Sequence, residues 1–457
     1  MFILGITVAY GADLILGEEV SFSNGATNLK ANNVQDAIEE IYNKTIDNSS
    51  CKNVSAPKLG EGLVPVTTEN DGTIKYADTS KKWYNYCDKI WANAVILEDG
   101  TNYKVGDTIQ ESDIQSYFVW IPKYKYKLWN VDVAVENAHE IEIVFDETNT
   151  TDFEGVSCKT PMTSGGSGNC NNGEYMTHPA FISMNTNGFW VGKYETGYKG
   201  ATSTAAAQVN ANDTSKIIIK PNVYSWRNIS VYNAFLNSYN YQRNLESHMM
   251  KNTEWGAVAY LSHSKYGKNA EININNNSNY KTGYSALPST NQQTMSGESG
   301  DGVSYNSAYN TTIGYKASTT GNINGIYDMS GGAAEYVSNY ISGVPGSSGF
   351  STTTLANYDN KYFDLYNSSS NTTTFQYRIL GDATGEMGPF KLYLDGDNIS
   401  RYHTSWNTDY SYFVSSSSSW LNRGGSYING AIAGAFYFHS YNGGNYNSVG
   451  FRIVLTP

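Results

Sequence analysis

The alternation of hydrophobic and polar residues predicts several short strands in the first half of the chain. Tyr124, Tyr126 and Leu128 alternate with lysines between residues 123 and 128, which is the period of a strand with one buried face. The same reading predicts strands at residues 18–30, 140–146 and 180–194. Residues 49–100, which contain the aromatic stretch Trp83–Trp91, are predicted to form a small β-rich module.

Three stretches instead carry apolar residues at helical spacing. In residues 33–42, Val34, Ala37, Ile38 and Ile41 share one helical face, and Asn33 is the predicted N-cap, with Asp36 in a capping-box-like position. Residues 228–241 and 248–261 predict two further helices. A short amphipathic helix near a membrane anchor is typical of a stalk or an oligomerisation element, here over residues 33–46. A helix packed on its own domain is the alternative.

Long stretches of Asn, Ser, Gly and Thr with little periodicity separate these elements. Residues 265–325 and 340–380 have this composition and predict long loops. Such loops count against a regular sandwich or barrel, and they favour a loop-rich scaffold that carries its function on loops. No fixed-period repeat is visible, which disfavours a solenoid or a propeller.

The first residues resemble the end of an export signal or an anchor. Residues 1–12 are apolar, lack a basic start and are too few to span a bilayer, while Ala9 and Gly11 have the small-residue spacing that signal peptidases tolerate. We predict the remnant of a signal peptide or membrane anchor whose start lies upstream; a buried strand is the alternative. The predicted organisation is such a remnant at 1–17, a strand and stalk helix at 18–48, a β-rich module at 49–115 and a larger domain at 116–457.

The amino-acid composition limits the kinds of molecule that this protein is expected to bind. The 457 residues predict about three folding units, or one large all-β unit with appendages. A net charge of −12 with only 16% charged residues excludes a basic nucleic-acid footprint and a highly charged disordered chain. The 38 tyrosines and 43 glycines have two explanations: AT-rich base composition, or a binding surface, because Tyr, Ser, Gly and Asn build adaptable binding sites.

The four cysteines provide evidence about the cellular compartment in which the protein resides. None has the C-x-x-C spacing of a zinc site, and four cysteines allow three pairings. Cys158 and Cys170 bracket a short segment and are predicted to form one disulfide, which leaves Cys51 with Cys87. Disulfides and an export signal both favour an extracytoplasmic location, either secreted or on a cell surface or virion.

Four segments in order resemble the formylglycine-generating-enzyme and sulfatase-modifying-factor family. Gly188–Thr196 is similar to its opening strand, and Asn252–Tyr260, which contains Trp255, to its second helix. Asn324–Val337 resembles its Gly-Leu-Tyr-Asp-Met signature, although Gly332-Ala-Ala replaces Asn-Val-Trp and Tyr336 replaces Trp. Arg423–Ser426 and Gly450–Arg452 match its Arg-Gly-Gly-Ser and Gly-Phe-Arg. The resemblance covers residues 180–457 and implies an α+β, C-type-lectin-like fold.

Several residues of these motifs are expected to be structural. Arg423 and Arg452 follow the pattern of buried, paired guanidiniums, with Asp328 and Glu335 as candidate partners. Gly424 and Gly425 supply backbone that is free to adopt positive φ.

The resemblance to the family's oxidase branch implies copper bound by a cysteine pair between the last two motifs. The interval from Tyr427 to Val449 contains no cysteine, and His403 and His439 are isolated. We therefore expect a non-catalytic branch without a cofactor, while an enzyme of the formylglycine-generating or sulfatase-modifying type is the alternative. Asp395 and Asp397 are weak candidates for calcium ligands; an Asx-type turn is the favoured explanation, because the twelve-residue calcium-loop pattern is absent.

The aromatic C-terminal segment is the predicted binding site. Large aromatic residues lie among Gly, Asn and Ser between residues 427 and 448, a composition suited to a protein or carbohydrate ligand on a host or bacterial surface. Phe436 and Phe438 are expected in the core. The predicted exposed residues are Tyr427, Tyr437, His439, Tyr441, Asn445 and Tyr446. The segment also resembles the variable region of proteins diversified by retroelements, and a phage tail receptor-binding component is a further alternative.

Overall fold

A computed structural model describes residues 53–129, 138–147, 175–286, 307–341, 343–366, 390–395, 398–412 and 414–457, with Gly173 and a few residues between 31 and 51. The chain divides into two units, residues 1–52 and 53–457. In the first unit the predicted N-cap is present: the Asp36 backbone N–H donates to Asn33 Oδ1 at 2.8 Å. The strand predicted at 18–30 and the signal or anchor remnant at 1–17 lie outside the described residues.

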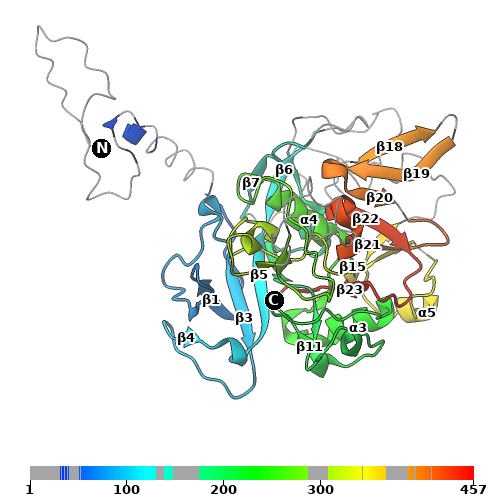
Figure 1. Cartoon of the computed structure of the whole chain (residues 1–457), viewed down its shortest axis with the longest axis horizontal. Helices are drawn as coiled ribbons and strands as arrows, with labels where there is room; N and C mark the ends of the chain where they lie inside the picture. The colour runs from blue at the N-terminus through cyan, green and yellow to red at the C-terminus, as the bar shows by residue number, and fades with distance from the viewer. Residues whose placement is uncertain are drawn as a thin grey trace, which may run out of the picture. The chain divides into compact units, whose positions relative to one another are not determined.

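The second unit is mixed α+β, with most of its regular structure in strands (Figure 1). An eight-stranded sheet has the order β12-β24-β9-β5-β3-β1-β2-β4. Its strands are β1 (Val64–Thr68), β2 (Ile74–Tyr76), β3 (Asn93–Leu97), β4 (Thr108–Ile109), β5 (Ile114–Pro122), β9 (Gly188–Gly192), β12 (His248–Met249) and β24 (Ile453–Leu455).

The segment predicted as a separate β-rich module at 49–115 is part of this sheet. Strand β3 pairs with β5, Asn93 facing Val119, and β5 pairs with β9, so β1–β4 extend a sheet that the later strands complete. The apolar residues of β3 and β5 are buried there rather than in a core of their own. The boundary predicted at residue 115 is therefore wrong, because the apolar residues on both sides of it share one core.

A seven-stranded sheet holds the C-terminal segment. Its order is β18-β19-β20-β22-β21-β15-β23, with β22 parallel to β20 and antiparallel to β21. The strands are β15 (Ala334–Tyr336), β18 (Phe390–Asp395), β19 (Asn398–Ser405), β20 (Tyr410–Tyr412), β21 (Trp420–Gly424), β22 (Gly434–Tyr441) and β23 (Val449–Phe451). In Figure 1 these orange, red and yellow-green strands lie side by side. Only Arg452 separates β23 from β24 of the first sheet.

Smaller sheets and short helices complete the described fold. A three-stranded sheet contains β7 (Ile143–Phe145), β6 (Tyr124–Lys127) and β8 (Tyr175–Thr177). Two-stranded pairs are β10 (Gly197–Tyr198) with β11 (Ile217–Ile218), β13 (Tyr284–Ser285) with β14 (Ser307–Ala308), and β16 (Asn339–Ile341) with β17 (Asp364–Tyr366). The α-helices are α2 (Pro179–Ser183), α3 (Val231–Tyr241), α4 (Asn252–Ser262) and α5 (Thr352–Leu355). The 3₁₀ segments include η3 (Glu111–Asp113), η9 (Asn360–Tyr362), η10 (Trp406–Thr408) and η11 (Tyr427–Ile432); η10 is interrupted by non-helical backbone at Asn407 and η11 at Gly430.

Most predicted elements of this unit are present, with shifted bounds. The alternation at 123–128 forms β6, in which Tyr124 and Tyr126 are buried. Helix α3 lies within the predicted 228–241, where Ser230 provides the cap. The stretch at 180–194 begins as helix α2, because Pro179 favours a first helical turn, and becomes a strand only at Gly188. The helix predicted from residue 248 starts at Asn252, since residues 248–249 pair with β24.

Helix α4 positions the C-terminal segment from inside the fold. Every residue of α4 is buried, as expected of a helix surrounded by other elements. The Tyr124 hydroxyl of β6 donates to the Ala257 carbonyl at 2.7 Å, and Trp255 Nε1 donates to the Ala435 carbonyl of β22 at 2.8 Å. The start of β22 is therefore fixed to the core.

Among the described residues, none of the helices has the length and apolar character needed to cross a bilayer.

Candidate functional site

Arg452 ties the two large sheets together below the C-terminal segment. Its Nε donates to Glu335 Oε2 at 2.8 Å, its Nη2 donates to Glu335 Oε1, and its Nη1 donates to the Gly192 carbonyl at 2.7 Å. The structure thus brings together Arg452 and one of its two predicted partners. Burial raises the pKa of Glu335 to about 7, although the ion pair with Arg452 opposes this rise.

Two further buried carboxylates surround this ion pair. Asp328 Oδ1 accepts from Asn275 Nδ2 at 2.8 Å and from the Gly283 backbone N–H at 2.9 Å. Glu195, which the sequence reasoning missed, accepts from the Ala333 backbone N–H at 2.8 Å. Burial, reinforced by Asp328, raises the pKa of Glu195, and burial also raises the pKa of Asp328. These carboxylates fix Asn275, Gly283 and Ala333, and the Gly332 carbonyl next to Ala333 accepts from the Tyr427 backbone N–H of η11.

Arg423 joins β22 to helix α4 through hydrogen bonds and a ring contact. Its Nε donates to the Tyr437 carbonyl at 2.7 Å and its Nη1 to Asn252 Oδ1 at 2.7 Å. The guanidinium also lies 5.6 Å from the centre of the Trp255 ring. Arg423 and Trp255 therefore fix the backbone of β22 to helix α4.

Gly424 and Gly425 adopt the positive φ expected of them, 80° and 69°. A Cβ on Gly424 would lie 3.2 Å from the Trp255 ring, and a Cβ on Gly425 would lie 3.0 Å from Ala433 Cβ. The turn from β21 into η11 therefore needs glycine both for its backbone conformation and for space.

A row of aromatic side chains crosses β20, β22 and the loop after β22; we call it the aromatic row. Its neighbouring ring centres are 5.3 Å apart for Tyr410 and His439, 5.5 Å for Tyr412 and His439, 4.7 Å for His439 and Tyr441, and 4.9 Å for Tyr441 and Tyr446. All five side chains are half-buried. The Tyr446 hydroxyl donates to Asn442 Oδ1 at 2.9 Å, and Asn445 beside it is exposed.

Burial holds His439 and Tyr441 of the aromatic row in their neutral forms near pH 7. Burial lowers the pKa of His439 to about 4, and burial, with Tyr446, raises the pKa of Tyr441. No Asp, Glu, Lys or Arg lies between Arg423 and Arg452 in the sequence. The segment between these two arginines therefore contributes rings and amides to the surface, but no carboxylate, ammonium or guanidinium group.

The prediction that Tyr437 is exposed is wrong. Its exposed fraction is 5%, and its ring packs against Tyr410 at 5.9 Å and against Gly425. Tyr437 alternates with the core residues Phe436 and Phe438 along β22, so it lies on the opposite face of the sheet. That face is covered too, in part by Tyr410, and little of the Tyr437 side chain is accessible. Phe436 and Phe438, at 3% and 0%, are in the core as predicted.

Tyr427 lies apart from the aromatic row but is linked to its loop. Its ring centre is 4.8 Å from that of Tyr280, and the Arg227 guanidinium stacks 3.7 Å from the Tyr280 ring centre. Arg227 Nη1 in turn donates to the Asn447 carbonyl. The sequence reasoning missed Tyr280, Tyr410 and Tyr412; only the alternating Tyr-Ser-Tyr at 410–412 gave a local signal for the last two.

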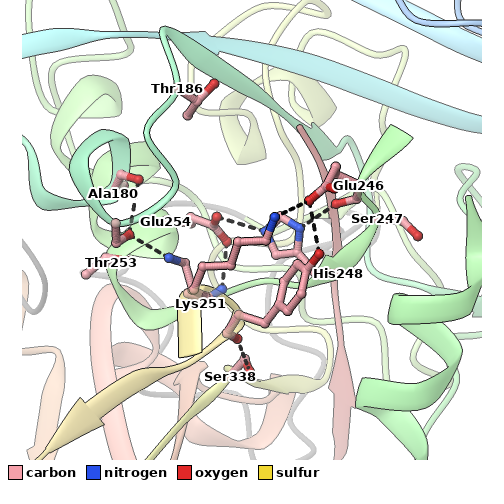
Figure 2. Close-up of polar contacts among 12 residues, drawn as sticks. Ala180, Thr186, Glu246, Ser247, His248, Lys251, Thr253, Glu254 and Ser338 are labelled. Carbon is pink, nitrogen blue, oxygen red and sulfur yellow. Dashed lines mark hydrogen bonds and ion pairs between the residues drawn. The ribbon is translucent and has the colours of Figure 1, made fainter. Parts of the chain in front are cut away.

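A second buried cluster of acid–base groups lies at the N-terminus of α4 (Figure 2). His248 Nε2 contacts Glu254 Oε1 at 2.9 Å, its Nδ1 contacts the Glu246 carbonyl at 2.8 Å, and the Lys251 backbone N–H donates to Glu254 Oε2 at 2.8 Å. Burial alone would raise the pKa of Glu254, but the attraction of His248 and Lys251 lowers it.

This cluster has a structural role. His248, Lys251 and Glu254 are each fully buried, so no substrate atom reaches the imidazole or the carboxylate. Lys251 Nζ donates to the hydroxyl of the exposed Ser183 at 2.5 Å. The positive charge of Lys251 also stabilises the carboxylates of Glu254 and Asp364. The cluster caps helix α4 and stabilises its first turn.

The remaining predicted residues lie at the limits of the described chain. Asp395 ends β18, and Asp397 lies outside the described residues, as do Cys158 and Cys170. No group of three or more His, Cys, Asp or Glu suited to a metal ion occurs within the part of the chain that the structure describes. Cys51 and Cys87 are both disulfide-bonded.

No protein-family model matches the chain, and neither does any curated protein. A solved structure described as a Major Tropism Determinant I1 variant aligns over 89% of this chain and 97% of its own, with 11% identity and a TM-score of 0.26. A likeness at this TM-score does not establish a shared fold, and the resemblance to the formylglycine-generating-enzyme family stays a prediction.

Proposed function

We propose that this chain is a non-catalytic, surface-displayed ligand-binding protein, an adhesin or receptor-binding protein, and that the aromatic row is its binding site. The observation that carries the proposal is the row itself: five half-buried rings in mutual contact, with His439 held neutral by burial. Exposed aromatic rings with a polar atom provide large contact area for few torsions, which suits a site for recognition rather than for chemistry.

The scaffold below the row supports this reading. Tyr410, Tyr412, His439 and Tyr441 project from strands, and the Arg423–Trp255 clamp fixes β22 to a fully buried helix. Sites on rigid strands lose little conformational entropy when a ligand binds. The exposed amide of Asn445 and the amide of Asn442 add hydrogen-bonding groups beside the rings.

The setting we propose is extracytoplasmic, on a cell surface or a phage virion. The disulfide-bonded Cys51 and Cys87 support an oxidising compartment. The net charge of −12 argues against nucleic acid as the partner. Diversification of the C-terminal segment by a retroelement belongs to the same proposal, and a near-identical template repeat beside a reverse-transcriptase gene in the neighbouring DNA would establish it.

The alternative is an oxidase of the formylglycine-generating type. The proposal of a non-catalytic protein rests on the lack of a cysteine pair between Tyr427 and Val449, because copper(I) favours thiolate ligands. Incubation with copper and a cysteine-containing peptide tests this directly. We expect no peptide aldehyde by mass spectrometry, and turnover would overturn the non-catalytic assignment.

The binding proposal is tested on arrays of purified bacterial and host surface proteins and of glycans. We expect the full chain to bind at least one array feature, and His439→Ala to weaken that binding. Tyr103→Ala is the matched control, because Tyr103 is also half-buried but lies near η3, where its hydroxyl donates to Asp113. Equal effects of both substitutions, or no binding to either array, would contradict the proposal.

A further inference from the structure

A buried lysine and a buried asparagine meet inside the eight-stranded sheet. Lys193 follows β9 directly, and Asn93 begins β3; strand β5 lies between these two strands, which do not pair with each other. Lys193 Nζ donates to Asn93 Oδ1 at 2.7 Å, and each residue has an exposed fraction of 2%. The contact therefore links two strands that share no backbone hydrogen bond.

Strand register brings the two side chains to the same face of the sheet. Val119 of β5 faces Val191 of β9 on one side and Asn93 of β3 on the other. Lys193 lies two residues after Val191, so it shares this face, because side chains alternate along a strand. The Lys193 backbone N–H donates to the Tyr117 carbonyl at 2.9 Å, which extends the pairing to this residue. The sheet itself therefore sets the contact.

The carboxamide of Asn93 is fixed in one orientation. Its Nδ2 donates to the Trp91 carbonyl and to the Asn324 carbonyl, both at 2.9 Å. These two bonds use both hydrogens of the amide nitrogen and direct Oδ1 toward the lysine. The carboxamide would lose both bonds if it rotated away from Lys193.

The amine of Lys193 has an amide rather than a carboxylate as its partner. Within the described residues no carboxylate forms an ion pair with this amine, and a lysine is rarely buried without one. Burial lowers the pKa of Lys193 to about 7, although the negative charge of Glu111 opposes this fall. A substantial fraction of the amine is therefore unprotonated at neutral pH, and an unprotonated lysine amine is a nucleophile.

We propose that Lys193 and Asn93 are the site of an intramolecular isopeptide crosslink. The lone pair of Lys193 Nζ attacks Asn93 Cγ, the Nζ–Cγ bond forms, and the Cγ–Nδ2 bond breaks. One proton passes from Nζ to the departing Nδ2, which leaves as ammonia, so the step requires no oxidant, reductant or other co-reactant. The product is a neutral secondary amide that retains Oδ1.

The surroundings favour this reaction. Two groups held in contact by a fold react with effective concentrations that reach about 10⁵–10⁸ M when they are well oriented. Burial excludes the water that would otherwise compete for the amide carbon. The crosslink removes a buried charge without a carboxylate partner and joins β3 covalently to the end of β9. It goes beyond the proposed function and does not depend on the ligand.

Mass spectrometry of the full chain, denatured and with its disulfides reduced, tests the proposal. The wild type is expected to be lighter than its sequence by one ammonia molecule, and trypsin should release a branched peptide that joins the segments containing Lys193 and Asn93. Lys193→Met should restore the full mass. Lys268→Met is the matched control, because Lys268 Nζ also donates to an asparagine, Asn273 Oδ1 at 3.1 Å, but Lys268 is only half-buried. This variant is expected to keep the mass loss.

The outcomes are unambiguous even if Lys193→Met fails to fold, because the wild-type mass and the branched peptide decide. A wild-type chain of full mass would overturn the proposal. Loss of ammonia within a single linear peptide would also overturn it, since an Asn-Gly sequence such as Asn442-Gly443 loses ammonia when it cyclises to a succinimide. Neither readout involves the arrays, so failure of the crosslink and failure of the proposed function are distinguishable.

Discussion

Replacing Arg452 by methionine tests the ion pair that joins the two large sheets. The change keeps the apolar stem but removes the guanidinium from Glu335, and it leaves the carbonyl oxygens of Gly192 and Tyr327 without their donor. Breaking one side of a buried ion pair costs about 3–5 kcal/mol. Because Glu195 and Asp328 lie in the same buried cluster, we expect a cost within this range at pH 7.5.

The pH dependence of this cost follows from Glu335. Its pKa in the folded protein, about 7, lies above its ordinary value, so it takes up a proton as the pH falls below 7. A protonated Glu335 needs no counter-charge, and the cost of Arg452→Met should therefore be smaller at pH 5 than at pH 7.5. The double variant Arg452→Met/Glu335→Gln should recover part of the loss at pH 7.5, but not the part due to the two carbonyl groups.

Urea unfolding followed by the fluorescence of buried tryptophans such as Trp190, Trp226 and Trp255 measures these differences. A cost of Arg452→Met below about 1 kcal/mol, or an equal cost at both pH values without recovery in the double variant, would refute the reasoning.

Two further predictions concern a glycine and a histidine. Gly332 has a φ of 68°, and a Cβ at this position would meet Glu195 Oε1, so Gly332→Ala should lower the free energy of unfolding by at least about 2 kcal/mol. Gly343 has a similar φ of 79° but lies in open space, so Gly343→Ala should lower it by only about 1 kcal/mol. Similar losses for the two variants in urea unfolding would contradict this reasoning. The pKa of His439 in the folded protein, about 4, lies below its ordinary 6.5, so the neutral ring contributes stability above pH 6.5 that is lost as the pH falls toward 4. The thermal unfolding temperature of His439→Gln should therefore fall less steeply than that of the wild type between pH 6.5 and 4, and parallel profiles would show that His439 does not contribute.

The pattern of hydrophobic and polar residues predicted an element well where the segment buries only one of its faces. The alternation at 123–128 and the helical spacing at 228–241 were sufficient because each segment has one buried face. The pattern predicted the helix at 248–261 but placed its start too early, because all of α4 is buried and no polar face marks where the helix begins. It also failed at residue 115, because strand pairing across a predicted boundary depends on segments far apart in the sequence.

The candidate site was predictable in composition but not in exposure. All of the candidate residues were predicted to be exposed; Asn445 is exposed, His439, Tyr441 and Tyr446 are half-buried, and Tyr437 is covered by Tyr410 from another strand. Period-2 alternation assigns a side chain to a face of the sheet but does not show whether that face is covered.

The central claim is that the aromatic row binds the ligand, and Tyr441 is its most direct test because its ring contacts both His439 and Tyr446. The measurement is the dissociation constant of the full chain for its strongest array ligand, compared between Tyr441→Ala and the control Tyr103→Ala. The account predicts a loss of about tenfold or more for Tyr441→Ala, with no change for Tyr103→Ala. Affinities within about twofold of the wild type for both variants would contradict it.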